Sequence, residues 1–430
     1  MNPQAVELNT TIEAANPAVL EMLSTRGEAI FFPAKGILGQ TAQAKGKRIN
    51  ATIGTALEDD GSPLSLGCLR DMVNVDPAEA FLYAPSYGRP NLRAVWKEML
   101  VTKNPSLEGK AISQPVVAQA LTHALSIAGY LFLDEGDELI LPDFYWGNYN
   151  LIFKNAYGAN FKTFNTYLEG GFDVQAMKEA VMQGAPGKRT LLLNFPNNPT
   201  GYTVSEAEAV AIKDALLEAA EAGYKVTVMT DDAYFGLVYE EGVFVESIFA
   251  ELADLHENIL AVKIDGATKE DYVWGFRVGF MTYGVKGGTA ELYKALEAKT
   301  AGAIRGNISN APAISQALLQ KAFTHPDYAS QKLEKFNTLK ARCNKVNEIL
   351  EAHPEYKDAF EPLPFNSGYF MCVALKDADP ETVRQVLLDE FDTGLIACSG
   401  VLRVAFSATP LGLLEELFDS LYKATLKVQG

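Results

Sequence analysis

Four side chains that could act together in chemistry follow apolar runs of the sequence. Asn198 comes three residues after the run RTLLLNF, within the turn-forming stretch PNNPTG. Asp231 ends the run KVTVMTD, and Tyr234 lies three residues further on. Lys269 lies five residues after the run ILAVKI. One such residue alone would be an ordinary turn or surface charge. An amide, a carboxylate with a tyrosine, and a lysine at successive run ends form a convergent polar set.

The runs before these side chains belong to an alternating pattern of strands and helices. Strands are predicted at 137–142, 189–195, 225–231, 259–264 and 278–284. The stretch 205–223 predicts a helix, because it begins with a capping Ser, ends in Gly and spaces its apolar residues by three and four. This order predicts a largely parallel sheet covered by helices. Ligands bind such sheets at the carboxyl ends of the strands, and the polar set there would suit a flat aromatic cofactor with an aldehyde and a phosphate.

The pattern of predicted secondary structure changes after the last of these strands. Long helical stretches follow, such as 330–353, and short strands of antiparallel type return at 367–375 and 400–408. The sequence therefore predicts an N-terminal arm with a small-domain segment, a large α/β domain and a smaller α+β domain. Their predicted bounds are 1–59, 60–310 and 311–430. The N-terminal segment is expected to pack on the small domain or on a partner subunit.

Composition excludes several classes of partner. The 430 residues include 48% hydrophobic and 21% charged residues, and the net charge of −17 argues against nucleic acid or an anionic membrane as partner. The four cysteines are scattered without CxxC pairing and the four histidines are dispersed, so we expect no metal site and a cytoplasmic location. The N-terminus lacks the pattern of a signal peptide, and no apolar run is long enough to span a membrane.

Several motifs, taken together, resemble a known family. They are INATIGTALEDDGSP, YAPSYG, YWGNY, NNPTG, DDAY, TKEDYVWGFRVG, IRGNISN and VLRVAFS. From about residue 49 to 406 the chain resembles a fold type I, pyridoxal-phosphate-dependent aminotransferase of class I, the aspartate/aromatic branch. The resemblance implies a large domain with a mostly parallel, seven-stranded sheet, a smaller α+β domain, and pyridoxal 5′-phosphate as cofactor.

The resemblance implies roles for the residues that would act on the cofactor ring. Lys269 matches the lysine that forms the Schiff base and then carries the proton, and Asp231 matches the carboxylate that pairs with the pyridine nitrogen. Tyr234 and Asn198 match the donors to the ring oxygen, and Trp146 matches the aromatic stacked on the ring.

It also implies a phosphate site. Arg277 matches the arginine that clamps the phosphate. Leu121 and Thr122 match the helix start that meets it with N–H groups and a hydroxyl. Tyr83 matches a tyrosine that reaches the phosphate from the other subunit, so the resemblance implies a homodimer with shared sites.

Three further matches concern the substrates, an amino acid and a 2-oxo acid. Arg403 matches the arginine that holds the substrate α-carboxylate, together with Asn198, and Gly54 matches a glycine whose backbone approaches it. Arg305 matches the neighbouring subunit's arginine that binds a side-chain carboxylate. The resemblance therefore favours aspartate or glutamate as amino donor, in a ping-pong exchange.

The chain departs from the family pattern at a few positions. Gly266 replaces a phosphate-binding serine, and we expect Thr268 to compensate for the missing hydroxyl. The usual glycine before the phosphate helix is replaced by AQALTH, and Ala56 replaces a more usual aromatic residue.

Other functions remain open on sequence alone. An aromatic or broad substrate range is one alternative, and a lyase or decarboxylase that uses the same Lys269 and Asp231 is another. A non-catalytic regulator is disfavoured by the retained Lys269 and by the lack of room for a DNA-binding domain in the first 50 residues. An NAD-dependent dehydrogenase is disfavoured because the chain contains no GxGxxG sequence.

Overall fold

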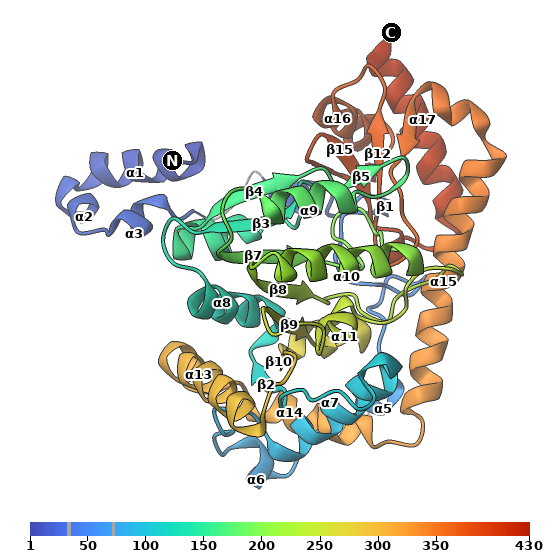
Figure 1. Ribbon diagram of the computed structural model, residues 1–430. Helices are drawn as coiled ribbons and strands as arrows, with labels where there is room; N and C mark the ends of the chain where they lie inside the picture. Colours follow the sequence, from blue (N-terminus) through green and yellow to red (C-terminus); the bar gives the residue numbers. More distant parts are fainter. Residues whose placement is uncertain (32–35, 71–73) are drawn as a thin grey trace.

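The computed structural model describes residues 1–31, 36–70 and 74–430. Residues 32–35 and 71–73, which fall within the predicted N-terminal and large-domain segments, lie outside the described residues. Seven strands form the main sheet in the order β2-β10-β9-β8-β7-β3-β4 (Figure 1). Their bounds are β2 (Val116–Ala118), β3 (Glu138–Pro142), β4 (Asn160–Phe164), β7 (Lys188–Leu193), β8 (Lys225–Asp231), β9 (Ile259–Asp265) and β10 (Gly279–Gly284).

The pairing within this sheet confirms the predicted, mostly parallel α/β fold. Strands β4, β3, β7, β8 and β9 pair in parallel, and only β10 is antiparallel, to both β9 and β2. The carboxyl ends of β7, β8 and β9 therefore meet at one edge of the sheet, where the polar set predicted from the sequence follows them. The five predicted strands are present, with bounds shifted by at most a few residues.

The main sheet is buried on both faces, which explains why its strands are apolar runs rather than alternating patterns. Leu192 packs into the core beside α8 (Ala120–Phe132), while Leu191 and Leu193 pack into a second core beside α9 (Val174–Met182) and α10 (Glu206–Glu221). The remaining helices around the sheet are α5 (Gly67–Arg70), α6 (Pro77–Ala80), α7 (Pro90–Lys103), α11 (Ile248–Leu252), α12 (Ala267–Glu270), α13 (Ala290–Ile308) and α14 (Ala313–Phe323).

A second, smaller sheet is antiparallel, as the sequence predicts, with the order β11-β12-β15-β14. Its elements are β11 (Phe360–Pro362), β12 (Met371–Leu375), β14 (Ile396–Cys398) and β15 (Val401–Val404), with α16 (Pro380–Glu390) and α17 (Leu414–Gln429) packed beside them. Strand β12 starts later than predicted, because Gly368 turns the chain with φ +71°. The long helix α15 (Tyr328–Ala352) runs along one side of the molecule, from near α5 to the small sheet (Figure 1).

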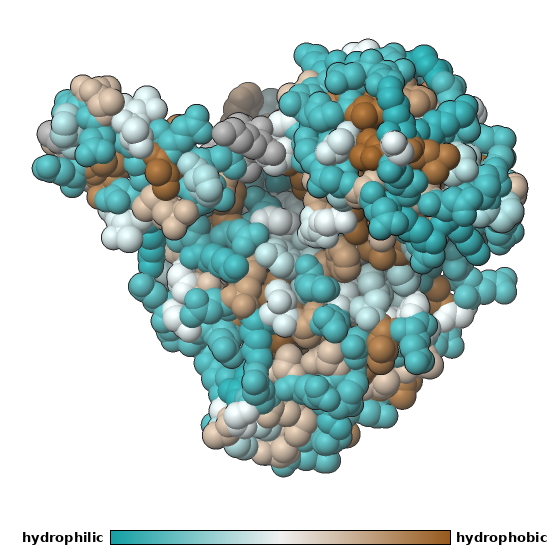
Figure 2. Space-filling model, turned by 90° about the horizontal axis from the view of Figure 1, so that it is seen from above, coloured by the Kyte–Doolittle hydropathy of each residue, from teal (hydrophilic) through white to brown (hydrophobic). Residues whose placement is uncertain are grey.

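The N-terminal segment divides into two parts. Strand β1 (Ile49–Asn50) pairs in parallel with β13 (Thr393–Gly394), and α4 (Ile37–Gln43) packs on β14, so this part joins the small sheet. The first part, α1 (Pro3–Ala15), α2 (Pro17–Glu21) and α3 (Thr25–Ala29), packs on itself and projects from the body, as Figures 1 and 2 show. A short hairpin, β5 (Tyr167–Leu168) and β6 (Gly171–Phe172), follows β4. None of the described helices combines the length and apolar character needed to cross a membrane.

Gly201 lies in the loop that follows β7, and its backbone packs directly against the backbone of Phe370 near the small sheet. This contact leads to a prediction about stability. Its φ is +75°, and a Cβ there would lie 1.8 Å from the carbonyl oxygen of Phe370. We expect Gly201→Ala to destabilise the protein by about 2–4 kcal/mol, from left-handed strain plus overpacking.

The matched control is Gly242→Ala. Gly242 has φ +78° but open space around a Cβ, so its substitution should cost only about 1 kcal/mol. Urea unfolding measures the free energy of unfolding of both variants. Equal losses of stability would show that the contact with Phe370 does not contribute.

Candidate active site

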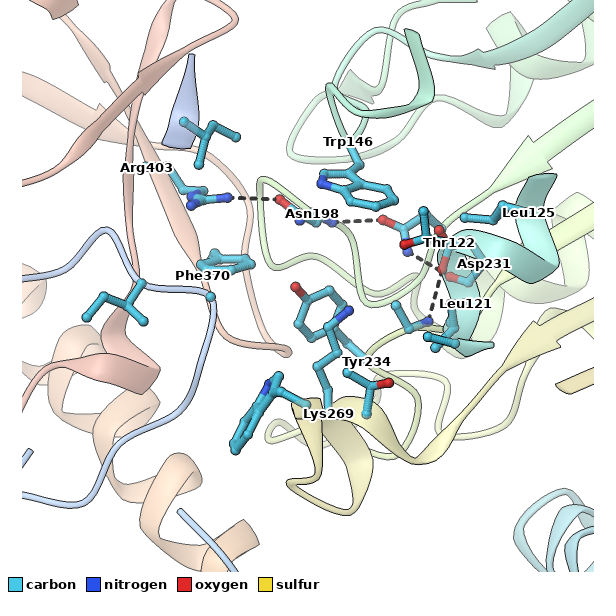
Figure 3. A pocket seen from close by; sticks show the side chains of 18 of the residues that line it. Leu121, Thr122, Leu125, Trp146, Asn198, Asp231, Tyr234, Lys269, Phe370 and Arg403 are labelled. Atoms are coloured by element: carbon cyan, nitrogen blue, oxygen red, sulfur yellow. Dashed lines mark hydrogen bonds between the residues drawn. The ribbon is translucent and has the colours of Figure 1, made fainter. Parts of the chain in front are cut away.

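A cavity of about 390 Å³ opens where the carboxyl edge of the main sheet faces the small sheet (Figure 3). Its lining comes from segments far apart in the sequence. The residues are Ile37, Thr41, Thr52, Ile53, Gly54, Ala120, Leu121, Thr122, Leu125, Trp146, Asn194, Asn198, Asp231, Ala233, Tyr234, Thr268, Lys269, Trp274, Arg277, Phe370 and Arg403. The structure therefore brings together every site residue predicted from the sequence except Tyr83 and Arg305.

Asp231 ends β8 and is buried beneath the cavity. Its Oδ2 accepts a hydrogen bond of 2.6 Å from the Tyr149 hydroxyl, and its Oδ1 accepts one of 3.1 Å from the Ala233 N–H. Burial raises the pKa of Asp231, while the bond from Tyr149 and the charge of Lys269 act to lower it. A carboxylate held in this way can pair with a cationic ring nitrogen.

Asn194 joins the ends of two neighbouring strands. Its Nδ2 donates to the main-chain oxygen of Asp231 at 2.7 Å, and its Oδ1 accepts from the Asn198 N–H at 2.8 Å. The side chain thus fixes the loop PNNPTG against the end of β8. Figure 3 shows the resulting row of polar groups, from Arg403 through Asn198 to Asp231.

Lys269 lies in α12, the single helical turn that follows β9, and its side chain points into the cavity (Figure 3). The Nζ lies 4.9 Å from the centre of the Tyr234 ring. Burial and the nearby Arg277 lower the pKa of Lys269 to about 8, although Asp231 opposes them. A substantial share of this amine is therefore neutral, and nucleophilic, near pH 8.

The first turn of α8, Thr268 and Arg277 surround one end of the cavity. An added Cβ at Gly279 would lie 2.6 Å from the carbonyl carbon of Ala120 and 2.8 Å from the N of Leu121, so β10 passes very close to the helix start. The Oγ1 of Thr268 is buried and has no hydrogen-bond partner among the described residues. A free buried hydroxyl, a helix N-terminus and a guanidinium are the donors that a phosphate group requires.

Gly266 explains the departure noted in the sequence. An added Cβ would lie 2.6 Å from the Val278 carbonyl oxygen and 2.9 Å from the Cα of Gly279. A serine at this position would require the backbone of β10 to move. The hydroxyl is therefore absent for steric reasons, and the unpartnered hydroxyl of Thr268 lies in the same cavity.

Arg403, on β15, is buried at the side of the cavity formed by the small sheet. Its Nη1 donates to Asn198 Oδ1 and its Nη2 to the Thr52 carbonyl, each at 3.2 Å, and its Cζ lies 4.1 Å from the centre of the Phe370 ring. Its Nε has no partner among the described residues. Gly54, next to it, has open space where a Cβ would stand. Arg403 and Gly54 together leave room for, and can bind, a small carboxylate.

Two predicted residues lie outside the cavity. Tyr83 is 90% exposed, and Arg305 is exposed near the end of α13, where its Nη1 donates to Ser309 Oγ at 2.9 Å. The sequence places both in a site shared with a second subunit, and their role stays a prediction.

Sequence reasoning missed several cavity residues. Tyr149 lies in the quoted motif YWGNY, but its bond to Asp231 spans 82 positions and has no local signal. Asn194 and Phe370 lie within runs for which the sequence predicts strands. Thr52 and Ile53 lie in the quoted motif INATIGTALEDDGSP and Trp274 in TKEDYVWGFRVG, but no role was assigned to them, and Ile37 lies outside every quoted motif.

Comparison with known proteins decides the family. The description "Aminotransferase class I and II" matches residues 68–421, most of the chain. The chain belongs to this family. It is 27% identical to an aspartate aminotransferase of Bacillus subtilis over 354 residues, which cover 78% of this chain and 82% of that protein. It is 30% identical to a probable aspartate/prephenate aminotransferase of Aquifex aeolicus over 46% of this chain and 48% of that one.

Solved structures agree with this membership. An aminotransferase from Anaerococcus prevotii, 25% identical, superposes with a TM-score of 0.82 over 94% of this chain and 99% of that one. The fold is also that of an aromatic aminotransferase from Pyrococcus horikoshii, at a TM-score of 0.72 and 17% identity, over 91% of this chain and 99% of that one. This aminotransferase is therefore a pyridoxal 5′-phosphate enzyme of fold type I.

The lowered pKa of Lys269 makes a prediction about the cofactor-free protein. Between pH 8 and 10.5 the unfolded chain binds more protons at this residue than the folded chain, so its contribution to stability rises with pH across that window. We expect Lys269→Met to exceed the wild-type stability by up to about 3 kcal/mol at pH 7, and this advantage should vanish by pH 10.5.

Chemical unfolding of both proteins at several pH values provides the measurement. Lys286→Met is the control, because Lys286 is an exposed lysine of the same chain. An advantage of Lys269→Met that did not change with pH would contradict the lowered pKa.

Proposed function

We propose that this enzyme exchanges an amino group between a dicarboxylic amino acid, aspartate or glutamate, and a 2-oxo acid. The observation that carries the proposal is one cavity lined by Lys269, Asp231 and Arg403, in which the carboxylate and the guanidinium are buried and the lysine is partly buried. An amine of lowered pKa, a buried carboxylate and a buried guanidinium with a free donor are the three groups that amino transfer to and from a carboxylic acid requires.

Pyridoxal phosphate, when bound, supplies an aldehyde for the amines and a ring that accepts electrons from the substrate's α-carbon. Asp231 would pair with the ring nitrogen, with Tyr149 fixing the orientation of the carboxylate. Tyr234 and Asn198 would donate to the ring oxygen, and Trp146 would cover the ring.

The phosphate group would be held by side chains and backbone at the other end of the cavity. The candidates are Arg277, Thr268, Thr122, the N–H groups at Leu121 and Thr122, and Tyr83 from a second copy of this chain. The unpartnered hydroxyl of Thr268 supports this assignment.

The substrate's steps then fall to this chain's own residues. Arg403 and Asn198 would bind the α-carboxylate beside Gly54, which orients the α-carbon towards Lys269. The neutral Lys269 Nζ would take the proton from that α-carbon and return it in the transfer step. Phe370, Trp146 and Trp274 line the same cavity and would shield the path of the proton from water.

The proposal that the amino donor is a dicarboxylic amino acid rests on Arg305. The cations among the described lining residues are Lys269, Arg277 and Arg403. Each is already assigned a role, in proton transfer, phosphate binding and α-carboxylate binding respectively. A side-chain carboxylate would therefore need a further cation, and Arg305 of a second copy is the candidate. The aspartate aminotransferases among the relatives support this choice.

A homodimer in the cytoplasm completes the proposal. The exposed Phe81, Leu82 and Tyr83 form an uncovered apolar turn, and the projecting helices α1–α3 expose Val6, Leu8, Val19 and Met22. A second copy of the chain would cover such surfaces. The free thiols of all four cysteines support a reducing compartment.

A second candidate function is transfer from aromatic amino acids. Apolar and aromatic side chains, among them Ile37, Ile53, Trp274 and Phe370, form much of the cavity wall. Such a wall would accept an aromatic ring as readily as it accepts an aliphatic chain.

The covalent role of Lys269 can be tested directly. We expect the purified protein to be yellow and borohydride to fix one pyridoxyl group per chain on the peptide that contains Lys269. Lys269→Ala should show no such adduct and should lose about 10²–10⁴ in turnover, because the proton carrier is absent. Peptide mass spectrometry locates the adduct, and an adduct only on Lys263 or another lysine would refute the role.

Substrate class can be tested with Arg305→Ala. We expect turnover of aspartate to fall by the equivalent of about 2–5 kcal/mol, and turnover of an aromatic donor to change little. Lys299→Ala, an exposed lysine on the same helix, is the matched control.

The assay screens amino donors against 2-oxoglutarate and oxaloacetate and also measures released ammonia. Equal losses for both donor types would remove the dicarboxylate assignment. Ammonia in place of the new amino acid would indicate a lyase.

A further inference from the structure

The two residues that follow Lys269, Glu270 and Asp271, are both buried carboxylates with ammonium partners. Glu270 Oε1 accepts hydrogen bonds from Lys103 Nζ at 2.5 Å and from Lys332 Nζ at 2.7 Å. Asp271 Oδ1 accepts from Lys332 Nζ at 3.1 Å and from the Tyr328 hydroxyl at 2.5 Å. Lys332 therefore bridges both carboxylates, directly behind the reactive amine.

The charges of this cluster cancel. Burial alone would raise the pKa of Glu270, but Lys103 and Lys332 lower it to about 2, and Asp271 and Glu270 in turn raise the pKa of Lys332. Glu270 and Asp271 are thus balanced by Lys103 and Lys332. The cluster places no net charge behind Lys269, whose pKa responds to burial, Asp231 and Arg277 instead.

Stability alone is a weak reason for such a cluster. Apolar side chains of the same size often stabilise a protein as well as a buried ion pair does, because desolvation of the charges is costly. What ion pairs supply is fixed geometry at a chosen place. Here that place is α12, a helix of four residues that carries Lys269 and is too short to be stable by itself.

Lys332 and Tyr328 both belong to the first turns of α15, and the middle of this helix reaches the other half of the site. Arg342 Nη1 donates to the Ser407 carbonyl at 2.5 Å, four residues after Arg403, and its Nη2 donates to Asp59 Oδ1 at 2.8 Å. Lys332 and Arg342 are ten residues apart, about 15 Å along a helix. Figure 1 shows α15 along one side of the molecule, reaching from near α5 to the small sheet.

We propose that Lys332 is a positioning residue for amino transfer: its bonds to Glu270 and Asp271 tie the turn that carries Lys269 to α15, the helix that also holds the segment after Arg403. The proposal rests on the proposed role of Lys269. It makes α15 the common support for the amine and for the carboxylate-binding arginine, so that the distance between them is set by one rigid element.

The first test uses the cofactor-free protein and Lys332→Met. Hydrogen exchange at the amides of residues 269–273 should become about tenfold faster, because the turn loses its support. Reductive methylation of Lys269, followed by mass spectrometry across pH, should show a midpoint moved upward from about 8, because the loosened amine gains water.

The controls lie at the same position and on the same helix. Lys332→Arg should restore exchange and midpoint in large part, because a guanidinium can still bond both carboxylates. Lys335→Met removes a lysine of α15 that pairs with Glu58 and Glu334 at 2.9 Å, and it should leave both readouts unchanged.

The holoenzyme provides a third readout. Lys332→Met should lower kcat by about tenfold while KM for the amino donor stays within about twofold, because Arg403 keeps its own contacts. Glu270→Gln, which preserves side-chain volume, should change exchange and kcat in the same direction, and it decides the matter if Lys332→Met does not fold.

Two outcomes would overturn the proposal. In the first, Lys332→Met or Glu270→Gln folds and matches Lys335→Met in exchange, midpoint and kcat. In the second, neither variant folds, which would make the cluster an element of stability only. Failure of the proposed function would look different: wild-type protein would form no borohydride adduct at Lys269, whatever the exchange data show.

Discussion

The site depends on the removal of one lysine amine from water. Lys269 keeps a pKa near 8 only because the cavity walls desolvate it and Arg277 repels its charge, while Asp231 acts in the opposite sense. Of these influences, only Arg277 belongs to the lysine's own segment of the sequence. Asp231 ends the neighbouring strand β8, Arg277 follows on the way into β10, and the cover comes from the small sheet. The parallel sheet is therefore the precondition for the chemistry, because it brings the strand ends to one edge.

Backbone strain occurs at three residues in the segments that form or adjoin the cavity. Ala120, Tyr272 and Arg277 all have left-handed φ values, of +65°, +58° and +56°, although none of them is glycine. Each such residue costs about 1–2 kcal/mol relative to an ordinary conformation. Dense packing tolerates the cost. The bend at Ala120 starts α8 beside β10, and the bend at Arg277 sets the direction from which its side chain enters the cavity.

The sequence was sufficient for the parts of the site that are local. Asn198, Asp231 and Lys269 could be predicted because each follows an apolar run, and the order of strands and helices predicts that such run ends meet. Contacts between distant segments could not be predicted in the same way. The bond from Tyr149 to Asp231 spans 82 positions and that from Arg403 to Thr52 spans 351. Gly266 shows a further limit of prediction from sequence. The sequence indicates only that a serine hydroxyl is missing at this position, whereas the structure shows that no side chain fits there.

The cavity is positively charged, although the protein as a whole is negatively charged. The chain carries −17 overall, yet the described lining includes Lys269, Arg277 and Arg403 as cations and Asp231 as its carboxylate. A positive cavity inside an acidic protein attracts small anions while the surface repels nucleic acid and anionic membranes. Arg403 is buried and remains charged, so an anion that enters the site would compensate its desolvation, whereas Arg277 is exposed. Arg277 suits a phosphate and Arg403 a carboxylate, and the ionic cluster behind Lys269 remains neutral. The excess of positive charge thus lies at Arg277 and Arg403, and Arg277 is near enough to the amine of Lys269 to lower its pKa.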